Sequence, residues 1–315
     1  MMMKTSDKRV FAFYVGLSAG LVLFLRQALV AYWEARSYLA SLNLCFSILL
    51  LGTLVLIWFA YLLQMVAWVI ILRYLGIDFD LNKTIQGYWW SLLPRYIPGS
   101  IWGYWSRSQW LEQTWGIEHK SSIIASILEI SALIIAAISI SITCVSIDLT
   151  NNYCVAFITL SLCLILLICL RYLMLKGQKL LLKRLEMIGP LEILRKHSPL
   201  SLLLLAVSLY MVIWITYGSA ISLITSTINP ALGNLPRSIL AVSISWFLGF
   251  IVFFVPTGLG VRELALSTLM ELQFNLTPAQ ASLVAVVFRV EIILSEILWL
   301  LIGLVVYAAN RKGQK

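Results

Sequence analysis

Residues 254–264 read FVPTGLGVREL, a stretch that places a proline, two glycines and a charged pair inside otherwise apolar sequence. Proline lacks the N–H of a helical residue and clashes with the preceding turn, so a helix should end before Pro256 and restart near Val261. We expect Pro256, Gly258 and Gly260 to form this break. Backbone groups left unpaired at membrane depth are tolerated only beside protein or a water-filled cavity. The stretch therefore predicts a cavity.

A related stretch lies in the first half of the chain, where residues 96–103 read YIPGSIWG and Arg107 follows. We expect Pro98 and Gly99 to break the chain here. A helix that begins near Lys83 reaches Pro98 after about 15 residues, or roughly 22 Å, which is shorter than the ~30 Å hydrocarbon core of a bilayer. The spacing therefore predicts a half-helix that enters the membrane and turns back.

Composition places the whole chain in a membrane. Of 315 residues, 61% are hydrophobic and 12% are charged, and the mean hydropathy is +0.94. Several apolar runs are long enough to span a bilayer, so the predicted class is an all-α polytopic membrane protein forming a single domain over residues 1–315. The net charge of +9 comes from lysines and arginines in short loops, which indicates membrane topology and no nucleic-acid partner.

Six full spans are predicted besides the two hairpins. The basic residues around them place both termini on the cytoplasmic side of the inner (plasma) membrane. The most basic loop, residues 171–196, includes an expected amphipathic helix at residues 181–188 that lies on the cytoplasmic face. The expected spans are residues 10–32, 39–75, 120–145, 153–175, 200–228 and 278–307.

The order of these elements predicts an inverted repeat. Residues 10–147 and 152–309 each contain two helices, a broken hairpin and a further helix, and an odd number of crossings separates the two units. Inverted repeats whose broken helices meet near the midplane are typical of transporters, which bind charged substrate groups at half-helix ends. The inversion holds only if neither hairpin crosses the membrane.

The sequence indicates no metal or cofactor. The five cysteines have no metal-type spacing, and no nucleotide-binding glycine-rich loop follows a strand. Cys144 and Cys154 flank a short polar loop, so either two free thiols or a disulfide between them fits the sequence.

The two motifs resemble those of the integral-membrane family named after the transmembrane region of lysylphosphatidylglycerol synthetase, also called flippase-like proteins. The matching residues are 96–102 with Arg107 and Gly116, residues 256–263, and the last helix with Arg289. The likeness extends over roughly residues 39–307.

The resemblance implies a role in handling lipid-linked head groups. Some relatives translocate aminoacylated phosphatidylglycerol, and others accompany cell-envelope glycan assembly. The sequence lacks the soluble aminoacyl-transferase domain of the two-part synthetases, so an envelope-glycan lipid stays open as substrate. The expected partners are membrane lipids, a polyprenyl- or glycerol-based lipid-linked substrate, and enzymes of envelope biosynthesis.

Arg262 and Glu263 are the leading candidates for substrate binding. An arginine at a helix break can hold a lipid phosphate with two hydrogen bonds, together with exposed backbone N–H groups. The alternatives are an ion pair that locks the hairpin, or snorkelling to the outer interface. Arg107 is the corresponding candidate in the first unit, and Arg95 fits an anchor for its half-helix.

Further ionisable residues lie within the spans. Arg289 and Glu296 are seven residues apart and share a helix face, whereas Glu291 points elsewhere. With Glu129, these residues fit either a substrate or proton site or structural ion pairs between helices. Tryptophans at positions 89, 90, 102 and 105 fit either a path for sugar or acyl groups or interfacial anchors.

Three functions remain open on these grounds. The first is a flippase-like transporter that passes an anionic lipid head group through a cavity between the two hairpins. The second is a membrane-embedded glycosyl or acyl transferase, which needs a base beside the reacting group. The third is a non-catalytic scaffold for envelope synthases that docks them through the basic loop.

Overall fold

A computed structural model describes residues 18–33, 36, 44–77, 81–97, 102–117, 119–150, 152–155, 157–161, 199–229, 232–252 and 255–312. All regular secondary structure in these ranges is helical, and no strand occurs within them, which confirms the predicted all-α class. Three helical segments are long and apolar enough to cross a membrane, namely Ser47–Tyr74, Ser121–Thr150 and Leu200–Ile228.

The chain begins with a shorter apolar helix, Ser18–Trp33. The following helices, with two 3-10 turns written as η, are α2 (Leu44–Tyr74), α3 (Leu81–Trp90), η1 (Leu93–Tyr96), α4 (Trp102–Trp115), α5 (His119–Thr150), α8 (Leu200–Ile228), α9 (Leu235–Ile251), η4 (Pro256–Gly258), α10 (Val261–Phe274) and α11 (Pro278–Lys312).

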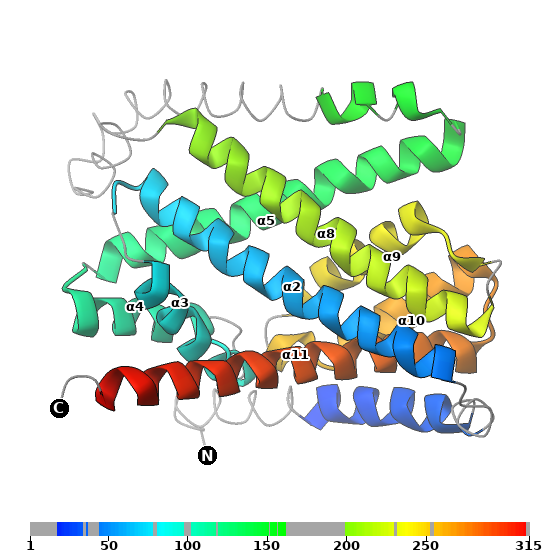
Figure 1. The fold of residues 1–315 in the computed structure, drawn as a ribbon. Helices are drawn as coiled ribbons and strands as arrows, with labels where there is room; N and C mark the ends of the chain where they lie inside the picture. Colours follow the sequence, from blue (N-terminus) through cyan, green and yellow to red (C-terminus); the bar gives the residue numbers. More distant parts are fainter. Residues whose placement is uncertain are drawn as a thin grey trace, which may run out of the picture.

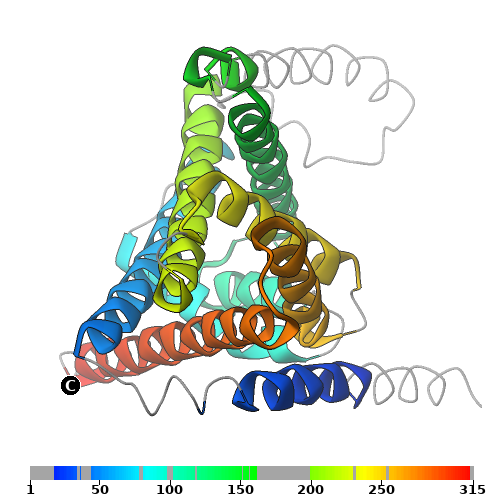
Figure 2. The same ribbon diagram turned by 90° about the vertical axis from the view of Figure 1, so that its right-hand side faces the viewer.

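Long helices frame the molecule. α2 and α8 run side by side through it, and each also packs on α5 and α11 (Figure 1). Seen after a quarter turn, α8, α5 and α11 form the sides of a triangle (Figure 2). The helix Ser18–Trp33 lies outside α11 in both views, and a hydrogen bond of 2.5 Å from Ser282 to Gln27 joins the two helices.

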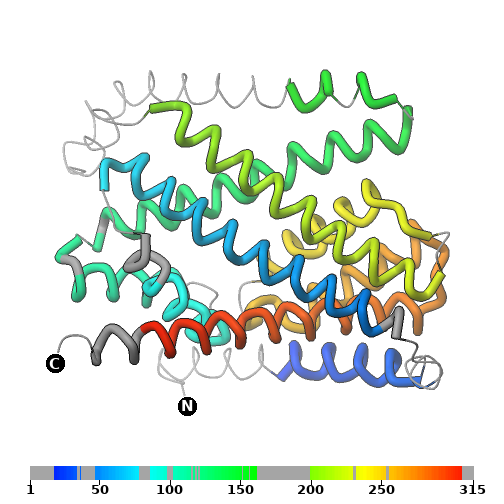
Figure 3. Tube along the Cα trace, in the orientation of Figure 1, coloured from blue at the N-terminus to red at the C-terminus, as the bar shows by residue number. Residues whose placement is uncertain are grey.

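The two hairpins lie at opposite ends of this frame. α3 and α4 occupy one end and α9 and α10 the other, as the chain trace in Figure 3 shows. The 3-10 turns at their tips, η1 and η4, contact each other in the interior. Two segments that are far apart in sequence therefore meet at one place.

The α5 helix buries a face that carries small residues. Ala125, Ala136 and Ser122 have no exposed surface, and Glu129 on the same face is also buried. Serine and alanine let neighbouring backbones approach closely, which matches the packing of α5 on α8 and α9.

The first half-helix is shorter than predicted. α3 ends at Trp90 and a 3-10 turn follows, whereas the sequence analysis extended the helix to Pro98. The reason is Pro94, which cannot donate to the Trp90 carbonyl group four residues back and clashes with it. Pro98 and Gly99 themselves lie outside the described residues.

The second break follows the sequence more closely. α10 begins at Val261, as predicted. α9 ends at Ile251, four residues before the expected Val255, which is extended with φ −93° and ψ 126°. A residue that precedes proline avoids the helical region, so Pro256 straightens the chain before it.

The last helix begins with a capping box. The Thr277 backbone N–H donates to the Gln280 side chain over 3.2 Å, and the Gln280 N–H donates to the Thr277 hydroxyl oxygen over 3.3 Å. Pro278 occupies the first helical position, where its missing N–H has no helical acceptor to lose.

Several predictions fall outside the described residues. They are the N-terminal part of the first span, most of the span at residues 153–175, and the amphipathic helix at residues 181–188 with its basic loop. Cys144 and Cys154 are described, and both are free thiols.

Candidate functional site

A cavity lies where the two breaks meet. Its volume is about 150 Å³. Its wall combines residues of both hairpins with residues of the long helices. The helix break at residues 254–264 had predicted such a cavity. The charged and hydroxyl-bearing side chains that line it are Tyr61, Tyr88, Arg95, Tyr96, Tyr104, Glu129, Tyr217, Ser245, Thr257, Arg262, Glu263, Arg289 and Glu296.

Left-handed backbone shapes the second break. Thr257, Gly258 and Gly260 have φ values of 51°, 69° and 80°. Glycine tolerates this region without steric cost, whereas other residues rarely adopt it. These turns let α10 begin at Val261 beside the cavity, so that Arg262 and Glu263 lie in its first turn.

Glu263 stabilises the break. Its Oε2 accepts a hydrogen bond of 2.5 Å from the Gly260 N–H. Its Oε1 lies 3.2 Å from Arg289 Nε, and Arg289 Nη2 donates to the Thr257 hydroxyl oxygen over 2.6 Å. Glu263 and Arg289 are both buried. The ion pair that locks this hairpin therefore joins Glu263 to Arg289 in α11.

Arg262 differs from the other arginines of the site. It lines the cavity, and no hydrogen bond or ion pair of its guanidinium group is found within the described part of the chain. The guanidinium carbon lies 5.6 Å from the centre of the Trp246 ring, a distance at which a cation is attracted to an aromatic face. Trp246 in turn stacks on Phe250, with ring centres 5.2 Å apart. Aromatic rings thus support this guanidinium and leave its hydrogen-bond donors available.

The first break contributes Arg95 and Tyr96. Arg95 lines the cavity with its guanidinium carbon 5.2 Å from the centre of the Tyr88 ring. The sequence analysis treated Arg95 only as an anchor. The available signal was its position three residues before Pro98, at the predicted break.

Two tyrosines hold the buried carboxylate of Glu296. Tyr61 donates to its Oε1 over 2.6 Å, and Tyr96 donates to its Oε2 over 2.5 Å. Tyr96 belongs to η1, Tyr61 to α2 and Glu296 to α11, so this contact ties the tip of the first hairpin to two long helices. The sequence analysis did not identify the tyrosines, because hydroxyl donors at this spacing have no distinctive pattern.

Replacing Tyr96 by phenylalanine should lower the free energy of unfolding by about 1–3 kcal/mol, because Glu296 then keeps a single donor for a buried carboxylate. The measurement is the melting temperature of the purified protein in detergent micelles. Tyr153→Phe is the matched control, since Tyr153 is exposed and its variant should melt like the parent protein. Equal melting temperatures for both variants would contradict the role given to Tyr96.

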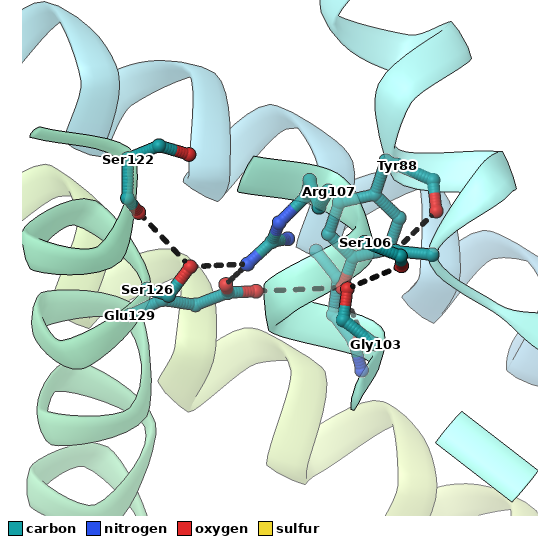
Figure 4. A network of polar contacts seen from close by, with 9 residues as sticks. Tyr88, Gly103, Ser106, Arg107, Ser122, Ser126 and Glu129 are labelled. Atoms are coloured by element: carbon teal, nitrogen blue, oxygen red, sulfur yellow. Dashed lines mark hydrogen bonds and ion pairs between the residues drawn. The ribbon is translucent and has the colours of Figure 1, made fainter. Parts of the chain in front are cut away.

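Arg107 forms a buried ion pair. Its guanidinium group contacts the Glu129 carboxylate and donates to Ser126 over 3.3 Å (Figure 4). The guanidinium carbon also lies 4.1 Å from the centre of the Trp68 ring. It is 1% exposed and is not among the residues that line the cavity. Glu129 does line the cavity, but its carboxylate is engaged by Arg107. The pair therefore joins α4 to α5, which matches the structural alternative named for these residues.

Glu291 lies apart from the cavity. It is buried and contacts Thr53 of α2, and it is absent from the cavity wall. Arg289 and Glu296 both line the cavity, which confirms that they share a face of α11 that Glu291 does not. Of the predicted tryptophans, Trp90, Trp102 and Trp105 are exposed, and the aromatic wall is instead formed by Trp214, Trp246, Phe250 and Phe288.

The geometry defines what this site can do. Each glutamate of the wall is engaged by an arginine, a backbone N–H or tyrosine hydroxyls, whereas Arg262 presents free donors. No group of three or more metal-binding side chains is found in the described ranges. A planar guanidinium group with unused donors beside aromatic rings is suited to bind a phosphate or carboxylate group.

Comparison with known proteins was made on the whole sequence. No curated protein and no solved structure matches the chain. The family model described as Lysylphosphatidylglycerol synthase TM region matches residues 11–303. This match covers nearly the whole chain and confirms the resemblance seen in the two broken motifs. The chain therefore belongs to the lysylphosphatidylglycerol synthase transmembrane-region family and is a multi-pass membrane protein.

Proposed function

We propose that this protein is a flippase-like transporter that passes the anionic head group of a lipid, of the kind used in envelope lipid or glycan assembly, through the cavity between its two hairpins. The observation that carries the proposal is that the guanidinium group of Arg262, in the wall of that cavity, has no hydrogen bond or ion pair among the described residues. The lipid tails stay in the bilayer while the head group occupies the polar interior.

The charge balance of the cavity favours an anion. Four arginines and three glutamates belong to the polar network in and beside the cavity, so one positive charge is in excess when all are ionised. An uncompensated charge away from water is costly, and a bound anion removes that cost. The arginines are Arg95, Arg107, Arg262 and Arg289, and the glutamates are Glu129, Glu263 and Glu296.

Two guanidinium groups approach the cavity from different hairpins. Arg262 comes from α10, and Arg95 comes from η1. A phosphate diester has two unesterified oxygens, which accept two parallel N–H bonds from one arginine. We assign this bidentate contact to Arg262, which lies in the first turn of α10, because Arg289 already pairs with Glu263 and donates to Thr257.

The proposed topology has six full spans and two re-entrant hairpins in an inverted repeat, with both termini cytoplasmic. The contacts support it, because exchanging each helix with its counterpart reproduces the same packing. Thus α2 packs on α11 as α8 packs on α5, and η1 contacts its own counterpart η4. In such an arrangement the cavity lies on the pseudo-symmetry axis, where it can open to either side in turn.

The test uses purified protein in liposomes that contain a fluorescent anionic phospholipid in both leaflets. Chemical quenching from outside measures its movement between leaflets. Arg262→Ala should slow movement about 10- to 100-fold, which corresponds to the ~1.5–3 kcal/mol of a hydrogen-bonded charged contact. Arg262→Lys should retain part of the rate, because lysine keeps the charge but loses the planar pair of donors.

Arg237→Ala is the matched control. Arg237 is partly exposed, pairs with Asp148 over 2.8 Å and does not line this cavity, so its variant should move lipid like the parent protein. No movement of any anionic lipid, or full activity of Arg262→Ala, would contradict the proposal. Conversion of the labelled lipid to a new species would instead support the transferase.

A further inference from the structure

We propose that Glu291 is a proton-binding site within the membrane, formed with Thr53 and the Leu50 carbonyl group of α2. The Thr53 hydroxyl oxygen lies 2.6 Å from Glu291 Oε1 and 2.8 Å from the Leu50 carbonyl oxygen. Both distances are those of a full O–H···O hydrogen bond. Glu291 is 6% exposed, so neither contact is replaced by bulk water.

The number of protons available in this cluster indicates the charge of Glu291. Two hydrogen bonds need two protons, a carbonyl oxygen has none, and a threonine hydroxyl group supplies one. Glu291 supplies the second proton if it is a neutral carboxylic acid. Its Oε1–H then donates to the Thr53 hydroxyl oxygen, and the Thr53 O–H donates to the Leu50 carbonyl oxygen. With a carboxylate at Glu291, the single Thr53 proton would have to serve both contacts as one bifurcated bond, which is weaker than the two full hydrogen bonds that these distances match.

The other buried glutamates of the described chain do not share this shortage. Glu129 is bonded by Arg107, and Glu263 by Arg289 and the Gly260 N–H. Glu296 receives two tyrosine hydroxyl protons for its two contacts. Glu291 contacts no cation in the described ranges, and its Oε2 has no hydrogen-bond partner there. An isolated buried carboxylate is costly, and a proton removes its charge.

The charged groups on the neighbouring elements have no hydrogen bond or ion pair to Glu291 within the described residues. α11 packs on α2, α3, α8 and α10, and Gln27 places the helix Ser18–Trp33 beside it. On that helix Arg26 is exposed, and α2 contributes no ionisable side chain near Thr53 between positions 47 and 60. The other ionisable side chains described on these helices line the cavity or lie outside it. Those of the cavity are Tyr61, Tyr88, Tyr217, Arg262, Glu263, Arg289 and Glu296. Those outside it are Tyr32 on the first helix, Arg73 and Tyr74 at the end of α2, Tyr210 in the core and Glu271 in the second half of α10.

A proton fits this site better than a metal cation. Hard cations take about six or more oxygen ligands, whereas this cluster offers the oxygens of Thr53, Leu50 and Glu291. The site lies on α11, whose opposite face carries Arg289 and Glu296 into the cavity. Loss or gain of the proton changes the contact between α11 and α2, so it acts on the helix that forms one wall of the proposed lipid path.

The test is infrared spectroscopy of the purified protein in detergent. A neutral carboxylic acid has a C=O stretching band separate from the band of a carboxylate. We expect the parent protein to show this band at neutral pH, Glu291→Gln to lack it and Glu296→Gln to keep it. Thr53→Val should keep the band but shift its frequency, because the carboxylic acid loses its hydrogen-bond acceptor. A parent spectrum without the band, or one that Glu291→Gln leaves unchanged, would overturn the proposal.

Sodium ions provide a second measurement. The melting temperature should be the same in sodium chloride and choline chloride of equal concentration. A saturable stabilisation by sodium that is lost in Glu291→Gln would overturn proton binding in favour of a metal cation.

Coupling of this proton to lipid movement rests on the proposed function. In the liposome assay, a pH difference across the membrane should change the rate for the parent protein and leave the rate of Glu291→Gln unaltered. A parent rate that ignores the pH difference would overturn the coupling. Absence of any lipid movement would instead contradict the proposed function, and the infrared result decides the proton site in either case.

Discussion

Replacing Glu129 by alanine should lower the free energy of unfolding by about 3–5 kcal/mol, because it leaves a buried arginine without its counter-ion. Arg107 is 1% exposed, and its Nε and Nη1 already have no hydrogen-bond partner in the described residues. Ser126, at 3.3 Å, is neutral and cannot compensate the charge. The rings of Trp68, Tyr88 and Tyr104 around the guanidinium group keep water away from it.

The control for this prediction removes both charges. The double variant Arg107→Met with Glu129→Leu replaces the ion pair by apolar side chains of similar length and should recover most of the lost stability. Unfolding by sodium dodecyl sulfate from mixed micelles measures the free energy for each variant. If the double variant is as unstable as Glu129→Ala, the loss stems from packing and the charge argument is wrong.

Replacing Gly260 by alanine should cost about 2–5 kcal/mol, the sum of a left-handed backbone and a steric overlap. Gly260 has a φ of 80°. A Cβ atom there would overlap the Gly20 carbonyl oxygen and lie 2.7 Å from Leu23 Cβ. The helix Ser18–Trp33 would have to move away from the break that it covers, because its backbone atoms cannot rotate aside.

Gly52→Ala is the matched control for this substitution. Gly52 lies within α2, and a Cβ atom there meets nothing within 4 Å. Alanine favours a helix by up to about 1 kcal/mol over glycine, so this variant should melt at or above the temperature of the parent protein. A Gly260→Ala variant that elutes as a single species and melts like Gly52→Ala would show that the break tolerates a side chain.

Of the six predicted spans, the structure bears out three as helices long and apolar enough to cross a membrane, and the place of the second break also followed from the sequence. Apolar length predicts α2, α5 and α8, and the left-handed glycines beside Pro256 predict the restart of α10 at Val261. These features depend on local chemistry, namely on the hydrophobic effect along one helix and on the covalent limits of proline and glycine. The predicted end of the first half-helix was too late in the chain, because it was assigned to Pro98 although Pro94 already ends the helix.

The pairing of charged residues was decided only by the tertiary structure. Spacing places Arg289 and Glu296 on one face of α11, but it does not show that Glu263 bonds Arg289 or that Arg107 bonds Glu129. These partners lie on different helices, so their distances depend on how the helices cross. The lack of a partner for the Arg262 guanidinium group among the described residues was also visible only in the tertiary structure. It is recognised only when the positions of the neighbouring carboxylates are known.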